Sequence, residues 1–293
     1  DENEVMEDVF RDAFDIPRII MALEIAAGFQ IEPGNTLIIF DEIQEIPRAL
    51  KALKYFCENA PEYHVIAAGS LLGVALHEGT SFPVGKVEFC DLYPMDYWEF
   101  LKACEEDGLA DLLDKRDYRL ITSFRNKYID YLKYYYYVGG MPEAVLIFSE
   151  QGDMRAAREV QKRLLAAYEN DFSKHAPKEI VTRIRMLWNS IPAQLSKENK
   201  KFIYGLIREG ARAREYEVAI TWLMDCGLVY KINRVNKPGY PLRAYQDFKA
   251  FKLYVLDIGL LGAMSGLNAR IILEKNRLFE EFKGALTEQY VMQ

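Results

Sequence analysis

The chain has 293 residues, of which 50% are hydrophobic and 28% are charged, and its net charge is −7. This composition excludes a disordered or low-complexity chain, which could not bury enough apolar surface, and the length favours two or three packed units. The longest apolar stretch, residues 19–29, contains Glu24 and falls short of the roughly 20 residues that span a bilayer.

The first third of the chain alternates between helical and strand patterns. Helical apolar spacing predicts helices over residues 5–14, 18–29 and 47–59, and β-rich apolar runs predict strands over 36–40, 63–68 and 86–93. Fully apolar strands separated by one helix are typical of a parallel sheet that is covered on both faces. We therefore expect an α/β fold with a partial parallel sheet in this part.

The rest of the chain changes to helices and ends in a mixed region. The predicted helices cover 96–104, 109–113, 118–137, 143–148, 153–168 and 177–195, and a second group covers 197–210, 215–226 and 279–292. A hairpin is expected from strands 228–235 and 241–247. Two helices followed by a hairpin is a winged-helix-like order. The run of four tyrosines at 134–137 cannot all face one core, so we expect some of them at a contact or in solvent.

Charge is distributed unevenly along this order. Residues 1–105 carry 20 acidic and 7 basic side chains, whereas the remainder carries 24 acidic and 30 basic ones. Residues 197–252 alone hold 12 basic and 6 acidic side chains. A basic segment of this kind can bind nucleic acid, and it can equally attract an acidic unit of the same chain.

The segment that most directly indicates a chemistry is Thr36–Glu42. An apolar strand that runs into Asp41 and Glu42 resembles a Walker B strand. An aspartate at the carboxyl end of such a strand can hold the Mg²⁺ of a nucleotide, usually through water. The neighbouring glutamate can polarise the attacking water, and Gln44 fits the same pattern. The competing interpretation is that the two carboxylates only end a strand in solvent.

A second strand, 63–68, ends at Gly69 and Ser70 one helix later. Ser70 would then lie near a γ-phosphate, in the position of a sensor-1 residue. No P-loop of the form G-x-x-x-x-G-K-[ST] is present. The segment from Gly79 to Lys86 has the wrong spacing and contains Pro83, so we reject it as a phosphate cradle, although Lys86 could reach the phosphates of a neighbouring molecule.

Taken together, these segments resemble a known family. The segments LIIFDEIQEIPRALKALKYF, HVIAAGSLLGVAL and LYPMDYWEFL, followed by GGMPE, YEND, REYEVAITWLMDCGL and FKLYVLDIGLL, look like the prokaryotic AAA+-type ATPases with an uncharacterised C-terminal domain. The resemblance implies a RecA-like ATP-binding core, a helical or winged-helix lid and a nuclease-like tail. It also implies ATP and Mg²⁺ as cofactors.

Two departures from this family bear on what can be carried over. Family members begin with a strand and P-loop upstream of the point that corresponds to Asp1, so we expect this chain to lack its Walker A segment. The nuclease-like end is also short, and Glu288 is the one carboxylate of that set expected here. Its alternative role is that of an ordinary helix glutamate. Lys252 and Asp257 could pair, contact a partner or hold the apolar segment around them in place.

We accordingly expect three domains and an ATPase function. The domains are 1–105, a partial AAA+ core; 106–195, a helical lid-like region; and 196–293, a winged-helix-like domain with a truncated α+β end. ATP hydrolysis would move the C-terminal units, with Asp41 at the metal and Glu42 and Ser70 catalytic. The arginines that could act on the nucleotide of a second copy in a homo-oligomer are Arg183, Arg185, Arg208, Arg212 and Arg214.

Two other functions stay open. The basic 197–252 segment could make the protein a DNA-binding regulator whose ATPase core is silent or acts as a switch. Alternatively, the protein is a scaffold in which the Asp41–Glu42 pair is vestigial. The four cysteines and three histidines are scattered without metal-ligand spacing, and no basic-then-apolar leader opens the sequence. These features favour free thiols in a soluble, cytoplasmic protein without a membrane partner.

Overall fold

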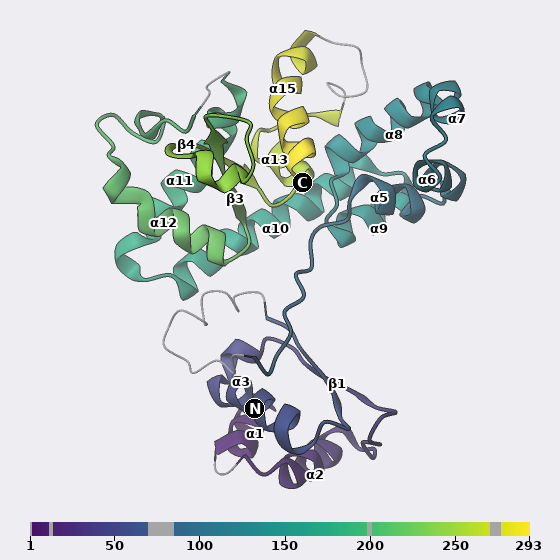
Figure 1. Ribbon diagram of the computed structural model, residues 1–293, viewed down its shortest axis with the longest axis vertical. Helices are drawn as coiled ribbons and strands as arrows, with labels where there is room; N and C mark the ends of the chain where they lie inside the picture. The colour runs from purple at the N-terminus through teal and green to yellow at the C-terminus, as the bar shows by residue number, and fades with distance from the viewer. Residues whose placement is uncertain (1, 12–13, 70–84, 198–200, 270–276) are drawn as a thin grey trace. The chain divides into compact units, whose positions relative to one another are not determined.

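The computed structural model describes residues 2–11, 14–69, 85–197, 201–269 and 277–293 of the chain. The chain forms two compact units, Asp1–Asp91 and Leu92–Gln293 (Figure 1). This division falls before the boundary expected at residue 105, because the helix that begins at Tyr97 packs on other helices of the second unit. The boundary expected at residue 195 falls inside a helix of that same unit.

The described part of the first unit combines helices with two short strands. Their bounds are α1 Glu2–Arg11, α2 Ile16–Ala27, β1 Leu37–Phe40, α3 Pro47–Asn59 and β2 His64–Ala67, with a 3-10 turn at Ile43–Glu45. Pro17 and Pro47 stand in the first turns of α2 and α3, where a backbone N–H has no helical partner to lose. Gly28 ends α2 in the left-handed conformation, which costs glycine little.

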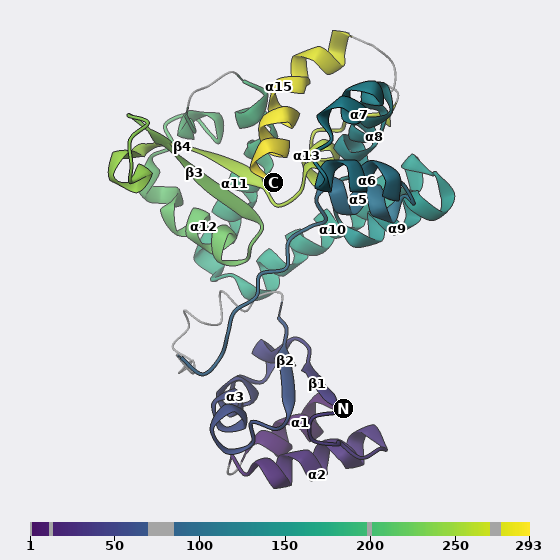
Figure 2. The same ribbon diagram turned by 45° about the vertical axis from the view of Figure 1, so that its right-hand side comes forward.

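Strands β1 and β2 pair in parallel, as their spacing predicted (Figure 2). One face of the pair packs on the helices, where Ile38 is buried in the same core as Phe56 of α3. The opposite face carries Leu37, Ile39 and Ile66, whose side chains are 50%, 61% and 53% exposed. We call these three residues the open sheet face. Apolar side chains that line up on one face of a sheet usually mark a surface that another element covers.

The third strand expected over residues 86–93 is not observed. These residues form a turn and irregular chain. Phe89, Leu92 and Tyr93 are 57%, 98% and 60% exposed, so the apolar pattern that suggested a strand is not matched by burial. A strand needs a partner for its backbone, and none of the described strands pairs with this segment.

The second unit is predominantly helical and contains one hairpin. Its first elements are α5 Tyr97–Ala103, α6 Asp107–Asp114, α7 Tyr118–Ser123, α8 Arg125–Val138, α9 Pro142–Gln151, α10 Met154–His175 and α11 Lys178–Ser196. They are followed by α12 Ala213–Asp225, β3 Val229–Val235, β4 Gln246–Val255, α13 Ile258–Met264 and α15 Arg277–Met292, with 3-10 turns at Tyr204–Leu206 and Leu242–Tyr245. Helix α5 begins with a full capping box, in which Asp96 and Glu99 each accept the backbone N–H of the other.

The four tyrosines at 134–137 do not share one environment: three are buried, and Tyr134 is partly exposed. Tyr135, Tyr136 and Tyr137 are at most 6% exposed on α8. Tyr135 packs edge-on against Phe100, and both Tyr135 and Tyr136 contact the ring of Tyr290 on α15. Neighbouring helices surround α8 on several sides, so successive side chains of one helix can all find apolar partners.

A pair of glycines between α8 and α9 allows a close approach of three chain segments. Gly140 donates its N–H to the carboxylate of Asp257 at 2.6 Å and accepts the N–H of Met95 at 2.8 Å. A Cβ on Gly140 would lie 1.9 Å from the Met95 carbonyl oxygen, and one on Gly139, where φ is +72°, would lie 2.3 Å from Asp257 Oδ1. Both positions therefore require glycine.

Asp257 is fully buried at this junction and caps α13 through the N–H of Leu260 at 2.9 Å. The side chain of Gln293 donates to the same carboxylate at 3.2 Å. Burial raises the pKa of Asp257, while these N–H donors act in the opposite direction. This geometry supports the structural role considered for Asp257 in holding its apolar segment in place.

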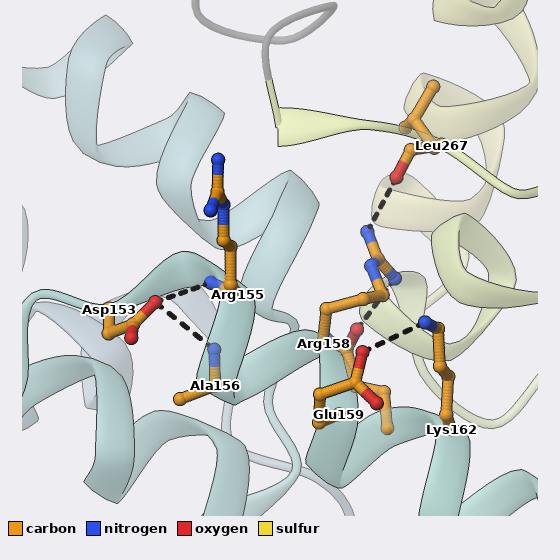
Figure 3. Close-up of polar contacts among 8 residues, drawn as sticks. Asp153, Arg155, Ala156, Arg158, Glu159, Lys162 and Leu267 are labelled. Carbon is orange, nitrogen blue, oxygen red and sulfur yellow. Dashed lines mark hydrogen bonds and ion pairs between the residues drawn. The ribbon is translucent and has the colours of Figure 1, made fainter.

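Helices α10 and α11 form the long supports of the second unit. Asp153 caps α10 by accepting the N–H groups of Arg155 and Ala156, as Figure 3 shows. One turn later the buried Arg158 reaches out of α10 to the carbonyls of Gly259 at 3.0 Å and Leu267 at 3.3 Å. Its guanidinium also lies 4.0 Å from the centre of the Tyr137 ring. Arg158 thus ties α10 to the first turn of α13 and to the segment that follows this helix.

Helices α10, α11 and α12 share an aromatic core. Phe172 of α10 lies edge-on between Trp188 of α11 and Trp222 of α12, with ring centres 5.8 and 5.7 Å away. Edge-to-face contacts of this kind add to the apolar burial of large rings. They fix α12, and the hairpin that follows it, on the two long helices.

The helix expected over residues 197–210 is not formed in the described residues of that stretch, which contain only the short turn Tyr204–Leu206. Tertiary hydrogen bonds replace it. The N–H of Phe202 donates to the Phe251 carbonyl at 2.6 Å, and the amide of Gln194 bonds both the N–H and the carbonyl of Ile203. The hairpin is present, but its second strand runs from 246 to 255 rather than from 241 to 247.

All four cysteines are free thiols, as expected from their spacing. Burial raises the pKa of Cys104 to about 11 and that of Cys226 to about 12, which makes these two thiols poor nucleophiles. Within the described ranges, none of the helices combines the length and the apolar character that a membrane crossing requires.

Candidate functional site

The paired carboxylates lie where the sequence placed them, at the carboxyl end of β1. The carbonyl of Phe40 accepts the N–H of Ala68 at 2.8 Å, and the N–H of Ile43 donates to the Ala68 carbonyl at 3.0 Å. These two bonds clamp the Asp41–Glu42 turn to the end of β2. The carboxyl ends of two parallel strands therefore meet at one edge of the sheet, which is where open α/β sheets bind ligands.

The turn itself has an unusual backbone. Glu42 has φ +47°, a left-handed conformation that few residues other than glycine adopt. The carboxylate of Asp41 accepts the N–H of Glu42 at 3.0 Å, and this bond supports the turn. Both carboxylates are exposed at the sheet edge. A strained turn that presents two acidic side chains is a feature found more often at functional sites than elsewhere.

Gln44 fixes the second carboxylate. Its side-chain amide donates to Glu42 Oε2. The amide oxygen of Gln44 is buried and has no hydrogen-bond donor within the described part of the chain. That oxygen can accept a hydrogen bond from a group that a ligand or its water shell brings to the site. The sequence pattern included Gln44, but the contact with Glu42 depends on the left-handed turn and could not be predicted.

The carboxylate oxygens of this turn suit Mg²⁺ better than a metal ion that protein ligands enclose on all sides. In the described residues no cluster of three or more histidine, cysteine or acidic side chains could enclose a metal ion. At this turn Asp41 offers a carboxylate oxygen, and the Glu42 carboxylate lies on the next residue. Magnesium commonly keeps several waters and takes one or two protein carboxylates together with substrate phosphates, and Asp41 fits that requirement.

Ser70, the third predicted residue, lies outside the described residues. The last described residue before it is Gly69, which follows Ala68 in the clamp described above. Lys86, considered as a cation for the phosphates of another molecule, forms an ion pair with Glu58 of α3 at 3.2 Å. Both partners are partly exposed, so this contact adds little stability and leaves Lys86 able to exchange partners.

The five arginines considered as cations for the nucleotide of a second copy differ in their surroundings. Arg185 donates to Ser173 Oγ at 2.6 Å, and Arg208 pairs with Glu215 at 3.2 Å, so both are engaged. The remaining three form no ion pair with any described acidic residue: Arg183, Arg212 and Arg214.

The Glu288 carboxylate is part of a small polar cluster on α15 and β4. It accepts from Lys252 Nζ at 2.6 Å and from the Tyr254 hydroxyl at 3.4 Å. Burial and the neighbouring Glu288 carboxylate raise the pKa of Tyr254 to about 12. Lys252 thus pairs with Glu288 and not with Asp257. This cluster holds α15 on the hairpin, in line with the reading of Glu288 as a helix glutamate.

Comparisons with known proteins relate two parts of the chain to family models. Residues 3–101 match the family model of an AAA domain, and residues 129–270 match a domain of unknown function, DUF8612. Among solved structures the chain is similar to a Walker-type ATPase of Pyrococcus abyssi, with 14% identity and a TM-score of 0.50. The similarity covers 86% of this chain and 68% of that one. No curated protein matches the chain.

The first third of the chain thus matches an AAA domain, and a later part matches a domain whose function is unknown. At this identity the structural similarity concerns the fold alone. The AAA match includes β1, β2 and the carboxylate turn between them. The similarity to a Walker-type ATPase extends well beyond the first unit.

Proposed function

We propose that the protein is an AAA-type ATPase and that Asp41 and Glu42 form the acidic half of its nucleotide site. The observation that carries this proposal is the position of the two carboxylates at the shared carboxyl edge of β1 and β2. The AAA-domain match over the same residues supports it. Magnesium-bound ATP would supply the phosphoanhydride bond that water breaks.

The residues of the turn take distinct roles in this proposal. Asp41 offers the carboxylate oxygen that is not supporting the turn to the shell of water around Mg²⁺. Glu42 accepts a proton from the attacking water as general base. Gln44 holds the Glu42 carboxylate in one orientation and offers its amide oxygen to the same water. Ser70 would hydrogen-bond the γ-phosphate or the water at the end of β2.

The phosphate-cradling element would lie upstream of these residues, and we propose that it covers the open sheet face. The side chains of Leu37, Ile39 and Ile66 are at least half exposed, whereas the opposite face of the two strands packs on helices. Burying each such side chain stabilises a structure by about 1.5–3 kcal/mol. A further strand paired along the edge of the two-stranded sheet, with its helix packed on this face, would extend the parallel sheet and bring a P-loop to its carboxyl edge.

Hydrolysis would change the contacts at the carboxylate turn and thereby move the C-terminal units, as nucleotide switches do. A second copy of the chain could complete the site with a cation. Arg183, Arg212 and Arg214 are the candidates for this role, because the other two arginines are engaged. A cytoplasmic location agrees with free cysteine thiols.

Calorimetric titration of magnesium-ATP tests the proposal directly. It would be performed on the 293-residue chain and on a version extended upstream to include a P-loop. We expect binding and turnover in the extended version alone. In that version Glu42→Gln should retain nucleotide and lose turnover by a factor of about 100 or more.

The matched control is Glu45→Gln, an exposed glutamate three positions along the same turn. It should leave turnover unchanged. A scaffold with a vestigial carboxylate pair predicts a different outcome, in which neither Glu42→Gln nor Glu45→Gln alters nucleotide binding or turnover. Absence of binding in both versions of the protein would count against the ATPase proposal.

A further inference from the structure

The hairpin of the second unit presents aromatic rings to solvent at its far end. Tyr240 in the connecting loop is 95% exposed, and Phe248 at the start of β4 is 75% exposed. Figure 2 shows β3 and β4 side by side after α12. Large rings exposed to this degree contribute little to the stability of the fold, because they bury little apolar surface.

A bulge in β4 holds Phe248 in this position. Asn233 pairs with Phe251, whereas the next residue of β3, Arg234, pairs with Asp247. Residues 248–250 are therefore extra residues on the β4 side. Bulges redirect side chains at sheet edges and near binding sites. Here the bulge turns Phe248 outward while Ala250, two positions later, is buried.

Asp247 stabilises the bulge by closing it at one end. Its carboxylate accepts the N–H of Lys249 at 3.0 Å and Arg234 Nη2 at 2.7 Å. The Lys249 N–H, and after it the Arg234 guanidinium, hold the pKa of Asp247 below its usual value. The bulge is thus a defined structure, in which the aromatic ring and the neighbouring lysine are presented together.

The hairpin also carries a strong excess of positive charge. Residues 229–252 contain six basic side chains and one acidic side chain, Asp247. Asp247 is paired with Arg234, and Lys252 is paired with Glu288. The side chains of the other cations form no ion pair with a described acidic residue: Lys231, Lys237, Arg243 and Lys249.

We propose that this surface, the loop 236–245 with the bulge 247–250, binds single-stranded nucleic acid. Lys237, Arg243 and Lys249 would contact phosphates, and unpaired bases would stack on Tyr240 and Phe248. A basic surface that tracks the backbone, combined with aromatic rings for the bases, is the arrangement by which proteins bind single strands without reading sequence. The proposal does not depend on ATP hydrolysis.

The neighbouring helix argues for a single strand rather than a duplex. A helix that reads the major groove needs donors along its outer face. On α12 the exposed positions after Arg214 are Glu217, Val218, Thr221 and Met224. Beyond Arg214 this face offers one acidic, one hydroxyl and two apolar side chains, and none of these four side chains is a cation. The hairpin, with its rings and cations, is the part that fits nucleic acid.

Fluorescence anisotropy of the 293-residue chain with a labelled oligothymidylate of about 15 nucleotides tests this proposal. Three phosphate contacts predict that log K falls with log salt with a slope of about −2. Lys249→Ala should reduce the size of this slope by about 0.7. Phe248→Ala and Tyr240→Ala should each weaken binding by about 5-fold or more while changing the slope little.

Matched controls separate this surface from general effects. Tyr118→Ala removes a 70% exposed ring from α7, and Lys115→Ala removes an exposed cation from the end of α6; neither should change the affinity. Since Phe248 and Tyr240 bury little, their variants should unfold at the same urea concentration as the parent chain.

Several outcomes would overturn the proposal. One is an absence of oligonucleotide binding at low salt. Another is binding that survives the double variant of Phe248→Ala and Tyr240→Ala. Tighter binding of a duplex of the same length would also contradict it. Equal competition by phosphatidylglycerol vesicles would assign the surface to membranes, and equal competition by polyglutamate would assign it to an acidic protein.

Discussion

Replacing Gly140 with alanine offers a sharp test of how the second unit is held together. The added Cβ would lie 1.9 Å from the Met95 carbonyl oxygen and 2.7 Å from the Met95 nitrogen, so the two backbones must separate. Separation breaks the bond from the Met95 N–H to the Gly140 carbonyl, worth about 1 kcal/mol, and the bond from the Gly140 N–H to the buried Asp257 carboxylate, worth about 1.5–3 kcal/mol. We therefore expect a loss of about 3 kcal/mol.

Urea unfolding followed by tryptophan fluorescence measures this loss in the right part of the molecule. All three tryptophans, Trp98, Trp188 and Trp222, belong to the second unit, so the signal reports that unit and not the first. The midpoint should fall by about 1 M or more.

The control for this variant is Gly108→Ala, at a helical position of α6 where a Cβ would meet nothing within 4 Å. Alanine there should stabilise the unit by about 0.5–1 kcal/mol, because glycine loses more chain entropy in a helix. A Gly140→Ala chain whose stability stays within about 0.5 kcal/mol of the parent would refute the reasoning about the close approach.

Three further predictions follow from other contacts. Asp257→Ala removes the cap of α13 and leaves the Gly140 N–H buried without an acceptor, so the same fluorescence assay should show a loss of about 2–4 kcal/mol; a loss below 1 kcal/mol would contradict the assigned role. An NMR titration of Asp247 should give a pKa below the usual value of about 3.9, and this pKa should rise in Arg234→Met. The contacts of the Asp247 carboxylate stabilise the fold at pH values above the unfolded pKa, and this stabilisation is lost as the pH falls through the lower folded pKa. A measured pKa at or above about 3.9 would exclude the bulge contacts. Replacing Ile39 and Ile66 together by serine should change stability by less than about 1 kcal/mol in the 293-residue chain, since both are exposed, while lowering turnover in the version extended upstream; unchanged turnover would remove the open sheet face from the ATPase proposal.

The elements that could be predicted from the sequence are those with local signals. Helix α3 has the predicted bounds, because Pro47 opens it and Pro61 follows its end. The parallel pairing of β1 with β2 followed from two apolar runs separated by a helix. The carboxylate pair could be found for the same reason, since Asp41 and Glu42 adjoin the strand that positions them.

The elements that could not be predicted depend on distant residues. The segment 197–210 has helical spacing, but hydrogen bonds from Phe202 to Phe251 and from Ile203 to Gln194 hold it in another conformation. The segment 86–93 has an apolar pattern without a strand to pair with. In the site, the bond between Gln44 and Glu42 arises from the left-handed backbone at Glu42, which no local residue preference indicates.

The junction around Asp257 also determines how the second unit can be made. The bond from Gly140 to Asp257 joins residues 117 positions apart, and the bond from Gln293 to the Tyr135 hydroxyl joins residues 158 positions apart. Contacts of such sequence separation slow folding, because long loops must close before any of them forms. While the ribosome is still adding residues beyond α10, the Gly140 N–H lacks its acceptor Asp257, and the Tyr135 hydroxyl lacks its donor Gln293. The helices of this unit must therefore wait for α13 and α15, and a nascent chain that ends before Asp257 is expected to stay incompletely packed.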